Sequence, residues 1–515
     1  MRHNFVGCVL VLLLVGVGQA IKKNAADRVR LNDGSVAEIS LNNVRTTLRD
    51  PYYVQQMSIG SNSVTTMNVT YVPPNISFLI FQVHTYQFNI ILSYDKDHLN
   101  KASNRSVFGS NIGLYVKPNS TQLQMFLKND NPQKVLAMIV ITLYGHNAPI
   151  PGGCNMEFDT EIAPYEKVLV HDGMVIVDAQ PASMPLNGVV NPNCDKNPVF
   201  HEMYQMYLPE YDFTSDAYFL SIGSMLTVDD IVQNGRQVAN PHGFSLMRRV
   251  FSAYTGTGSV YVTVATYGDY SAAYVPTFSY ACSPVTDPTS CEILPDGTSK
   301  FISAVTFIIG VCSIFAGHYI QPADNFIPLL FTCTVIGYCA IGSIGYSLLA
   351  GFIVALVAMW FSTVCPCIVT FTLGFFVACI VQFNAPGWII LQNNWVFWIL
   401  FITTSVCVGL ITALLGSIAC IVTCAVFSSF MVILPIDYWT GSSLKYIIIN
   451  VIRRATVSGF GSASVTPPIQ TTDIVLIVFW MLMIIIRFTS PLIPGVLQNA
   501  GYGGSESTRL LSSVF

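Results

Sequence analysis

Hydrophobic and polar positions are distributed unevenly along the chain, and the change comes near residue 300. The segment 301–436 contains a single formally charged residue, Asp324. A soluble domain needs charged surface, because uncharged surface of this extent associates and precipitates. Apolar runs of about 17–25 residues match the thickness of a bilayer core. The pattern therefore predicts a polytopic membrane protein, with the lipid bilayer as its partner over this segment.

Proline, glycine and asparagine divide this segment into predicted spans at about 301–320, 326–345, 347–364, 368–383, 395–415 and 417–434. A further span follows a polar gap, at 474–488. We predict an α-helical seven-transmembrane bundle over residues 299–490. Small residues four positions apart, such as Gly409 and Ala413, favour close packing of its helices.

The polar gap contains the segment 443–454, which is amphipathic if it is helical. Ile447 and Val451 share one face, and Arg453 and Arg454 lie mostly opposite. The segment is too short to span, so we expect a helix lying on the membrane surface. An external N-terminus and seven spans place this basic loop outside, although basic loops favour the cytoplasm. We keep seven spans and a cytosolic C-terminus, and the topology of the segment stays open.

The first twenty residues have the pattern of a secretory signal peptide. Arg2 and His3 precede an apolar run, 5–17, which leads to the small residues Gly18 and Ala20. We expect cleavage after Ala20. An uncleaved signal anchor is the alternative, but the apolar run is too short for it. Cleavage places the mature N-terminus outside the cytosol.

The region between the signal peptide and the spans is polar enough to form an ectodomain, and its pattern is that of β-strands. Segment 78–94 is rich in aromatic and β-branched residues, and side chains alternate strongly in 259–267. A strand, Tyr-Gly and then a cysteine occur late in each half. We predict an all-β ectodomain of two tandem β-sandwich-like modules, 21–153 and 154–298. Alternatively, late strands of unrelated β domains share this pattern.

Four Asn-x-Ser/Thr sequons lie in the first module, at Asn68, Asn75, Asn104 and Asn119. One match to so short a pattern means little. Four behind a signal peptide, with none later in the chain, indicate a glycosylated luminal or extracellular face. We therefore expect glycans on these four asparagines.

The ectodomain contains four cysteines, Cys154, Cys194, Cys282 and Cys291. An even number in an oxidising compartment indicates two disulfides, for which three connectivities exist. We favour Cys154–Cys194 and Cys282–Cys291, which close short loops.

Motifs for catalysis are weak or incomplete. His201 and Glu202 begin a zinc-protease motif, but Gln205 occupies the place of the second histidine ligand. Asp437 and Asp473 fall at the ends of predicted spans, whereas ion-coupled transport needs ionisable groups in mid-span. The net charge of −4 gives no indication of a nucleic-acid partner. We expect no catalytic residues, no metal site and no cofactor.

The last residues, 491–515, predict a flexible cytosolic tail, because their glycines and serines cannot form a core. Glu506 stands four positions before Leu510 and Leu511. This spacing is typical of dileucine sorting signals, in which two leucines enter an apolar pocket of a clathrin adaptor. Such a short pattern also arises by chance. We expect endosomal and lysosomal membranes as well as the cell surface.

The signal peptide, the glycosylated β-rich ectodomain and the Gly- and Cys-rich spans together resemble the transmembrane 7 superfamily member 3 family. The most specific local feature is the segment Pro151-Gly-Gly-Cys-Asn-Met-Glu-Phe158. The resemblance covers nearly the whole chain and places this segment at a domain junction. It implies no established catalytic residues, and it implies a role in cell survival and protein homeostasis. The spans also resemble a wider seven-pass domain family of unassigned activity.

Two hypotheses of different classes follow. The first is a non-enzymatic receptor-like or adaptor glycoprotein, whose ectodomain binds an extracellular or luminal protein or glycan and whose bundle anchors or transmits. The second is a channel, transporter or lipid scramblase with a neutral-lined pathway. Flux or lipid scrambling by the purified protein in liposomes distinguishes them, because the first hypothesis predicts neither.

Overall fold

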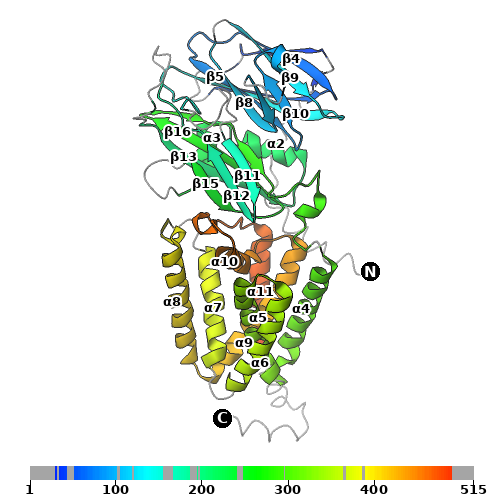
Figure 1. Cartoon of the computed structure of the whole chain (residues 1–515), viewed down its shortest axis with the longest axis vertical. Helices are drawn as coiled ribbons and strands as arrows, with labels where there is room; N and C mark the ends of the chain where they lie inside the picture. Colours follow the sequence, from blue (N-terminus) through cyan, green and yellow to red (C-terminus); the bar gives the residue numbers. More distant parts are fainter. Residues whose placement is uncertain are drawn as a thin grey trace, which may run out of the picture. The chain divides into compact units, whose positions relative to one another are not determined.

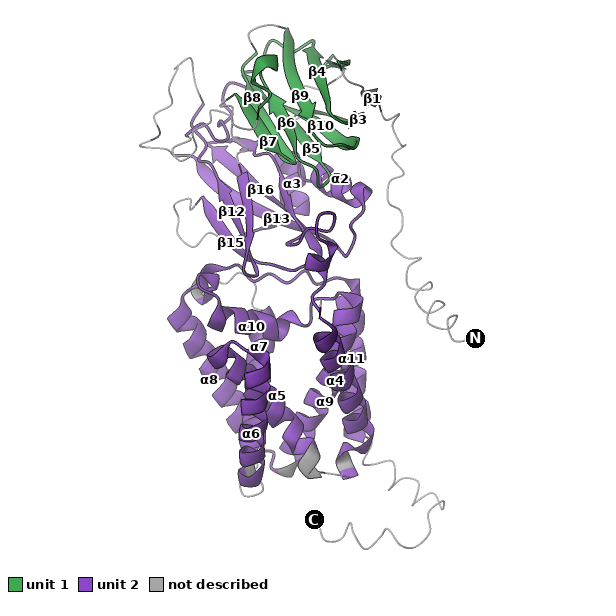
Figure 2. Ribbon diagram, turned by 45° about the vertical axis from the view of Figure 1, so that its right-hand side comes forward, with its two compact units in different colours: residues 1–143 green, residues 144–515 purple. Residues whose placement is uncertain are grey.

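The computed structural model describes residues 29–31, 34–42, 44, 51–100, 105–118, 121–154, 166–185, 194, 198–239, 247–294, 296–319, 321–362, 367–384 and 389–489. The chain divides into two compact units, residues 1–143 and 144–515 (Figure 2). Three sets of predicted features lie outside the described residues: the signal peptide, the sequons at Asn104 and Asn119, and the tail with Glu506, Leu510 and Leu511.

The first unit is a β-sandwich of two five-stranded sheets. One sheet has the order β1 (Val29–Leu31), β3 (Tyr52–Ile59), β10 (Val135–Tyr144), β5 (Phe78–Thr85) and β8 (Asn111–Val116). The other has the order β2 (Val36–Ser40), β4 (Ser63–Thr70), β9 (Gln122–Asn129), β6 (Ile90–Ser93) and β7 (Ser106–Gly109). In each sheet the first strand pairs parallel with its neighbour, β1 with β3 and β2 with β4.

The alternation of side chains explains how these sheets face each other. Along β4 every second residue is buried, including Thr65, Met67 and Val69, and the residues between them are half-buried. A strand of this kind has one face in the core and one toward solvent. Strands β5 and β10 are buried over nearly their whole length, which fits the aromatic and β-branched composition of 78–94 and 135–144.

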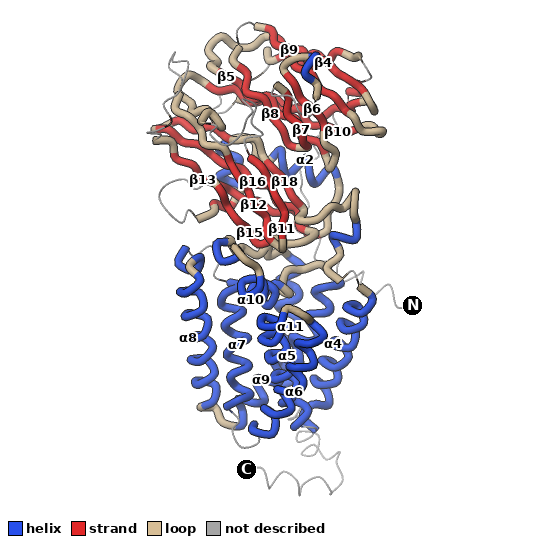
Figure 3. Tube along the Cα trace, viewed as in Figure 1, coloured by secondary structure: helices blue, strands red, loops and turns tan. Residues whose placement is uncertain are grey.

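The second unit begins with another sandwich, whose strands, like those of the first unit, are red in Figure 3. Its three-stranded sheet has the order β11 (Glu166–His171), β12 (Met174–Ala179) and β15 (Arg248–Ser252). The other sheet has the order β14 (Arg236–Gln237), β13 (Phe200–Glu210), β16 (Thr257–Tyr267) and β17 (Tyr270–Ala273), and β18 (Thr277–Ser279) also pairs with β16. The predicted all-β ectodomain of two sandwich modules is confirmed.

Two short helices in this second module were not predicted. They are α2 (Ser215–Gly223) and α3 (Val228–Asn234), and both lie between β13 and β14 in the chain. Each begins at a capping threonine, because Thr214 accepts a hydrogen bond from the Ala217 amide and Thr227 accepts one from the Asp230 amide. Helices of two turns are too short to show a helical period, so the caps were the available signal.

Both favoured disulfides are present in the structure. Cys154 pairs with Cys194, with 5.8 Å between the Cα atoms, and Cys282 pairs with Cys291 at 5.1 Å. The second disulfide lies a few residues before the first membrane helix. It closes a short loop at the end of the second module.

The rest of the second unit is a bundle of long apolar helices (Figure 1). They are α4 (Gly297–Ala316), α5 (Gln321–Ile341), α6 (Ile344–Ser362), α7 (Cys367–Asn384), α8 (Asn394–Ala413), α9 (Ser417–Thr440) and α11 (Thr471–Thr489). Among the described residues, six helices are long and apolar enough to cross a membrane, and α7 is a shorter apolar helix. Helix α9 is the core of the bundle, because 72% of its apolar window is buried, against 17–28% for the other five.

Predicted span boundaries differ from the structure by a few residues, and the largest difference is at the end of the sixth span. We expected the sixth span to end at 434, before Pro435, but α9 continues through this proline to Thr440. Membrane helices tolerate an internal proline where the surroundings satisfy the freed backbone groups. The helix ends at Gly441, whose φ of +81° is the left-handed conformation of a C-terminal cap.

Glycine lets α7 and α8 approach each other closely. A β-carbon on Gly374 would lie 2.1 Å from the Ser405 carbonyl oxygen, and one on Gly409 would lie 2.7 Å from the Phe371 ring. These two glycines belong to the small-residue pattern found in the sequence. The outer faces of the helices expose large apolar side chains such as Leu349, Ile402 and Ile485, as expected for lipid-facing surface.

Candidate functional site at the junction of module and bundle

Helix α10 (Tyr446–Thr456) lies in the long connection between α9 and α11 and packs against both α5 and α7. Its apolar residues are buried, as expected for an amphipathic helix, but Asn450 and Arg454 on the polar face are buried as well. The helix is therefore enclosed by protein on both faces, which differs from the expected helix on the membrane surface.

The basic side chains of α10 bind protein groups. The Arg454 guanidinium donates to the Leu391 carbonyl at 2.6 Å and to Asn394 Oδ1 at 3.0 Å, and it lies 4.3 Å from the centre of the Phe397 ring. Burial lowers the pKa of Arg454 to about 10, so the group still carries its charge at neutral pH. Because these charges are engaged in the fold, the segment is a poor indicator of membrane topology.

The segment that follows α10 pairs with the edge of a sheet in the second module at one residue. Ser464 forms an isolated parallel bridge with Phe251 of β15. Its amide donates to the Val250 carbonyl at 2.8 Å, and its carbonyl accepts from the Ser252 amide at 3.1 Å. The connection between two membrane helices thus binds the edge of the β11-β12-β15 sheet through two backbone hydrogen bonds.

Further hydrogen bonds join the same segment to β13. The Tyr207 hydroxyl donates to the Thr466 carbonyl at 2.7 Å. The Gln470 side chain donates to the Leu208 carbonyl at 2.8 Å and accepts from the Glu210 amide at 3.1 Å. Both sheets of the module are therefore held by residues 464–470, immediately before α11 begins. We call residues 441–470 the junction segment.

Helix α10 makes a third set of contacts with the module. Arg453 donates to the Ala253 carbonyl at 2.7 Å, and the Tyr446 hydroxyl accepts from the Thr255 amide at 3.0 Å. Asn450 accepts from the Ser252 hydroxyl at 2.9 Å. These polar contacts are buried or half-buried, where a hydrogen bond to a charged group is worth about 1.5–3 kcal/mol.

Buried charges fix the turn at the start of the junction segment. The Lys445 ammonium lies 3.4 Å from Asp437 Oδ2, and both side chains are at most 1% exposed. Asp437 also accepts from the amides of Leu444 and Lys445, at 2.9 and 3.0 Å. Asp473 in the first turn of α11 accepts from the Ser443 amide and hydroxyl, at 2.6 and 2.8 Å. The turn therefore ties the end of α9 to the start of α11.

Glu210, the last residue of β13, faces this cluster with few partners of its own. Its Oε2 accepts from the Thr472 hydroxyl at 3.3 Å, and its Oε1 is buried without a hydrogen-bond partner. Burial raises the pKa of Glu210 to about 8, and Asp473 adds to the shift while Lys445 opposes it. The carboxyl group is thus largely protonated at neutral pH.

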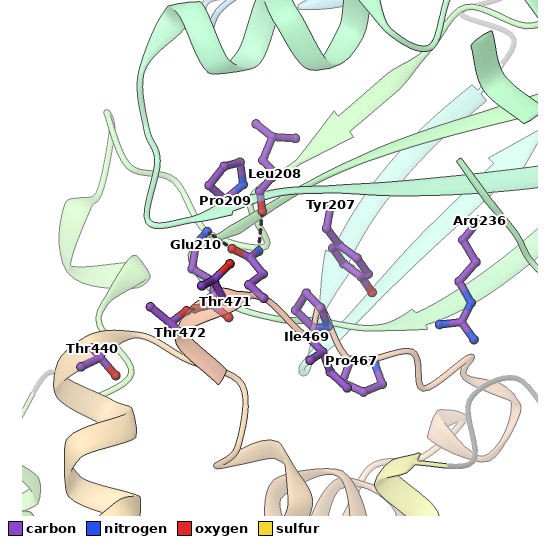
Figure 4. A pocket seen from close by; sticks show the side chains of 12 residues that line it. Tyr207, Leu208, Pro209, Glu210, Arg236, Thr440, Pro467, Ile469, Thr471 and Thr472 are labelled. Atoms are coloured by element: carbon purple, nitrogen blue, oxygen red, sulfur yellow. Dashed lines mark hydrogen bonds between the residues drawn. The ribbon is translucent and has the colours of Figure 1, made fainter. Parts of the chain in front are cut away.

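A cavity of about 720 Å³ opens at the junction. Its lining comes from the end of β13, from Arg236 of β14, from Thr440 at the end of α9, and from residues 467–472. Figure 4 shows Glu210, Thr472 and Thr440 at one side of the cavity and Arg236 at the other, with Tyr207 between them. The cavity therefore has a carboxyl group at one side and a guanidinium group at the other.

A second buried pair lies in the bundle, at the ends of α5 and α11 away from the junction. The Arg487 guanidinium donates to Asp324 Oδ2, and the Ser313 hydroxyl donates to Asp324 Oδ1 at 2.8 Å. A β-carbon on Gly317 would lie 2.5 Å from Asp324, so glycine allows this close approach. The sequence pattern gave no indication that these two charges pair.

Comparison with known proteins gives three family models along the chain. The "TM7SF3-like, N-terminal immunoglobulin-like domain" matches residues 45–144, and the "TM7SF3-like, second immunoglobulin-like domain" matches residues 149–285. The "TM7S3/TM198-like domain" matches residues 303–490. Together the three models cover most of the chain in the expected order. The chain belongs to the TM7SF3-like family.

Curated relatives agree with this assignment. The chain is 27% identical to human transmembrane 7 superfamily member 3 over 450 residues, which is 81% of this chain and 77% of the human one. It is 27% identical to the rat protein of that name over 456 residues, covering 81% of this chain and 79% of the other. The mouse protein of that name is 26% identical over 473 residues, which is 85% of this chain and 81% of the mouse one.

Within this TM7SF3-like chain, the predicted site residues lie in different places. Asn75 is exposed in a turn, while Asn68 is half-buried in the middle of β4. His201 lies singly in the core of the second module, where its Nε2 accepts from the Ala182 amide at 2.9 Å and burial lowers its pKa to about 4. Over the residues that the structure describes, no three His, Cys, Asp or Glu side chains are placed to hold a metal ion.

Nothing in the sequence pattern of this TM7SF3-like protein predicted the junction. Its contacts join residues about 200–260 positions apart, such as Ser252 with Asn450 and Tyr207 with Thr466. The available signal was the length of the connection between α9 and α11, because connections longer than about 12–15 residues are usually functional.

Proposed function

We propose that this TM7SF3-like protein is a non-enzymatic, receptor-like or adaptor membrane glycoprotein. Its ectodomain binds an extracellular or luminal protein or glycan, and its bundle anchors the ectodomain and responds to that binding. The observation that carries the proposal is the backbone bridge that Ser464 forms with Phe251 at the edge of β15. A shift of the second module has to move the junction segment, which runs directly into α11.

The bundle end of this connection supports transmission. Asp437 and Asp473 belong to α9 and α11, and both hold the turn 442–445 by buried hydrogen bonds. Because α9 is the most buried helix of the bundle, a displacement there changes its packing against α4, α5, α7 and α11. Packed helices that have two alternative arrangements convert a small local shift into a change of state.

The absence of catalysis is part of the proposal. The ionisable groups of the bundle engage one another, Lys445 with Asp437 and Arg487 with Asp324. Buried pairs of this kind serve structure or switching. The family resemblance implies a role in cell survival and protein homeostasis. We propose that the receptor-like or adaptor function serves these processes.

The test uses an antibody fragment against the second module as a surrogate ligand. Hydrogen–deuterium exchange of the full-length protein in nanodiscs should then change at the ends of α9 and α11. Ser464→Pro, which removes the amide that donates to Val250, should abolish this response, and Ser464→Ala should retain it. A silent exchange pattern in the wild type would contradict the proposal. Lipid scrambling or ion flux by the purified protein in liposomes would favour a channel, transporter or scramblase.

We also propose sorting to endosomal and lysosomal membranes in addition to the cell surface. The proposal rests on the spacing of Glu506, Leu510 and Leu511 in the tail and on a clathrin adaptor as its partner. Replacing both leucines by alanine should move the protein toward the cell surface, as measured by surface biotinylation. An unchanged distribution, or staining of a tail epitope in unpermeabilised cells, would contradict it.

A further inference from the structure

The cavity at the junction combines three features that are seldom found together. It is about 720 Å³ in volume, large enough for a polar headgroup. It has the Glu210 carboxyl group at one side and the Arg236 guanidinium at the other. Its rim includes Thr440 and Thr471, which are terminal residues of the membrane helices α9 and α11. The cavity therefore opens where the polar headgroups of a bilayer lie.

The side of the cavity near Glu210 favours a cation. Glu210, Asp473 and Asp437 interact electrostatically, and Lys445 is the cation that opposes them. The Lys445 ammonium is already engaged by Asp437 and by the Ser442 carbonyl. The buried Glu210 Oε1 has no hydrogen-bond partner in the structure. A primary ammonium of a ligand would donate a hydrogen bond to that oxygen, and its charge would stabilise the ionised form of the Glu210 carboxyl group.

The opposite side favours an anion. The Arg236 side chain is exposed on β14 and lines the cavity, and its planar guanidinium suits a phosphate group. Ile469, which is 49% exposed, also lines the cavity, and Trp439 beside Thr440 is 58% exposed. These side chains place apolar surface next to the charged groups, at the depth where a lipid passes from headgroup to acyl chain.

From this arrangement we propose that the cavity binds a zwitterionic phosphoamine group, with the phosphate at Arg236 and the ammonium at Glu210. Lipids of the leaflet on the ectodomain side and soluble phosphoamines share this chemistry. The site goes beyond the receptor-like function and does not depend on it, because binding here requires no transmission through the junction segment.

The experiment measures lipid binding to the full-length protein by native mass spectrometry from a non-ionic detergent. The probes are dihexanoyl phosphatidylethanolamine, dihexanoyl phosphatidylglycerol, which lacks the amine, and soluble phosphoethanolamine. The wild type should bind phosphatidylethanolamine at least about tenfold more tightly than phosphatidylglycerol, as expected for one charge-assisted contact. Binding of phosphoethanolamine would identify the soluble source as sufficient, and binding of the lipid alone would identify the membrane as the source.

Variants locate the site. Glu210→Gln and Arg236→Gln should each weaken phosphatidylethanolamine binding by about tenfold. Asp269→Asn and Lys167→Gln remove exposed charges of the same signs elsewhere on the module and should bind as the wild type does. Thr471→Trp fills the cavity from an exposed position and should abolish binding while the thermal unfolding midpoint is retained. Equal affinity for the two lipids, or unchanged binding in Glu210→Gln, Arg236→Gln and Thr471→Trp, would overturn the proposal.

Discussion

Gly173 of the second module lies directly against Arg453 of α10. A β-carbon on Gly173 would be 2.7 Å from Arg453 Nε. The glycine is the second residue of the turn between β11 and β12, and both turn residues have positive φ, 46° at Asp172 and 76° at Gly173. An Asp-Gly pair suits this hairpin turn for its backbone conformation. Here the missing side chain also makes room for a guanidinium from the helical bundle.

Gly173→Ala should therefore destabilise the protein in two ways. The left-handed conformation costs an alanine about 1 kcal/mol, and the new methyl group displaces Arg453 from the Ala253 carbonyl. Gly268→Ala is the matched control, because Gly268 has a φ of +58° with no atom near its β-carbon position. Thermal unfolding of the full chain in detergent should show the larger loss for Gly173→Ala. Equal losses would show that the contact with Arg453 contributes nothing.

The buried pair of Asp324 and Arg487 predicts strongly non-additive variants. Removing one partner leaves an uncompensated charge in the bundle and should cost about 3–5 kcal/mol. Asp324→Asn and Arg487→Gln should each lower the unfolding temperature and the folded yield. The double variant should recover a large part of the loss, which a double-mutant cycle measures. Additive losses would mean that the two groups do not depend on each other.

Glu166 predicts a pH dependence of the second module. The side chain is 2% exposed, and burial raises its pKa from 4.5 to about 8, although it accepts hydrogen bonds from the Thr263 amide and the Thr277 hydroxyl. Between about pH 4.5 and 8 the unfolded chain loses this proton and the folded chain keeps it. Stability contributed by Glu166 is therefore greatest below pH 4.5 and is lost as the pH rises toward 8.

Glu166→Gln removes this dependence while it preserves the shape of the side chain. The stability of the wild type relative to the variant should fall as the pH rises from 5 to 8, by at most about 1.4 kcal/mol per pH unit. Unfolding midpoints of both proteins across this range give the difference directly, because all other titrating groups are shared. A difference that is independent of pH would show that Glu166 is ionised in the folded protein.

The sequence predicted the elements better than their connections. Strands and spans depend on side chains close together in the chain, so the alternation in 259–267 and the uncharged run 301–436 located them. Short helices such as α2 depend on one cap, Thr214, and were missed. The pairing of Arg487 with Asp324 spans 163 positions. Several charges lie near span ends, and their spacing along the chain does not say which of them pair. The partner of each charge is set by how the helices pack.

Exposure separates two of the predicted glycosylation sites. Asn75 is exposed in the turn after β4, where an acceptor asparagine is accessible in the folded module. Asn68 is half-buried within β4, and its Oδ1 is buried. In a eukaryotic host, Asn75→Gln should reduce the mass shift on glycosidase treatment, whereas Asn68→Gln should reduce it less. An unchanged shift for Asn75→Gln would show that this sequon is unused.

Loss of either disulfide should lower surface expression. Cys154→Ser and Cys282→Ser each remove a covalent link worth roughly 2–4 kcal/mol. Cys420→Ser is the matched control, because Cys420 is a buried residue of α9 that belongs to neither of these two disulfides, and serine is nearly its size. Surface biotinylation should rank both ectodomain variants below the control. Equal expression of all three would argue against a structural role for the two bridges.

The bridge at Ser464 also sets an order of assembly during synthesis. The free edge of β15 meets its partner only after six membrane helices have been made, roughly 200 residues later, or about 10–40 s at ordinary rates of translation. Until then the second module presents an unpaired sheet edge in the compartment that receives it. Completion of that sheet consequently reports that the preceding helices have been inserted in the correct orientation. A chain with one helix misplaced would keep the edge open and remain recognisable as unfinished.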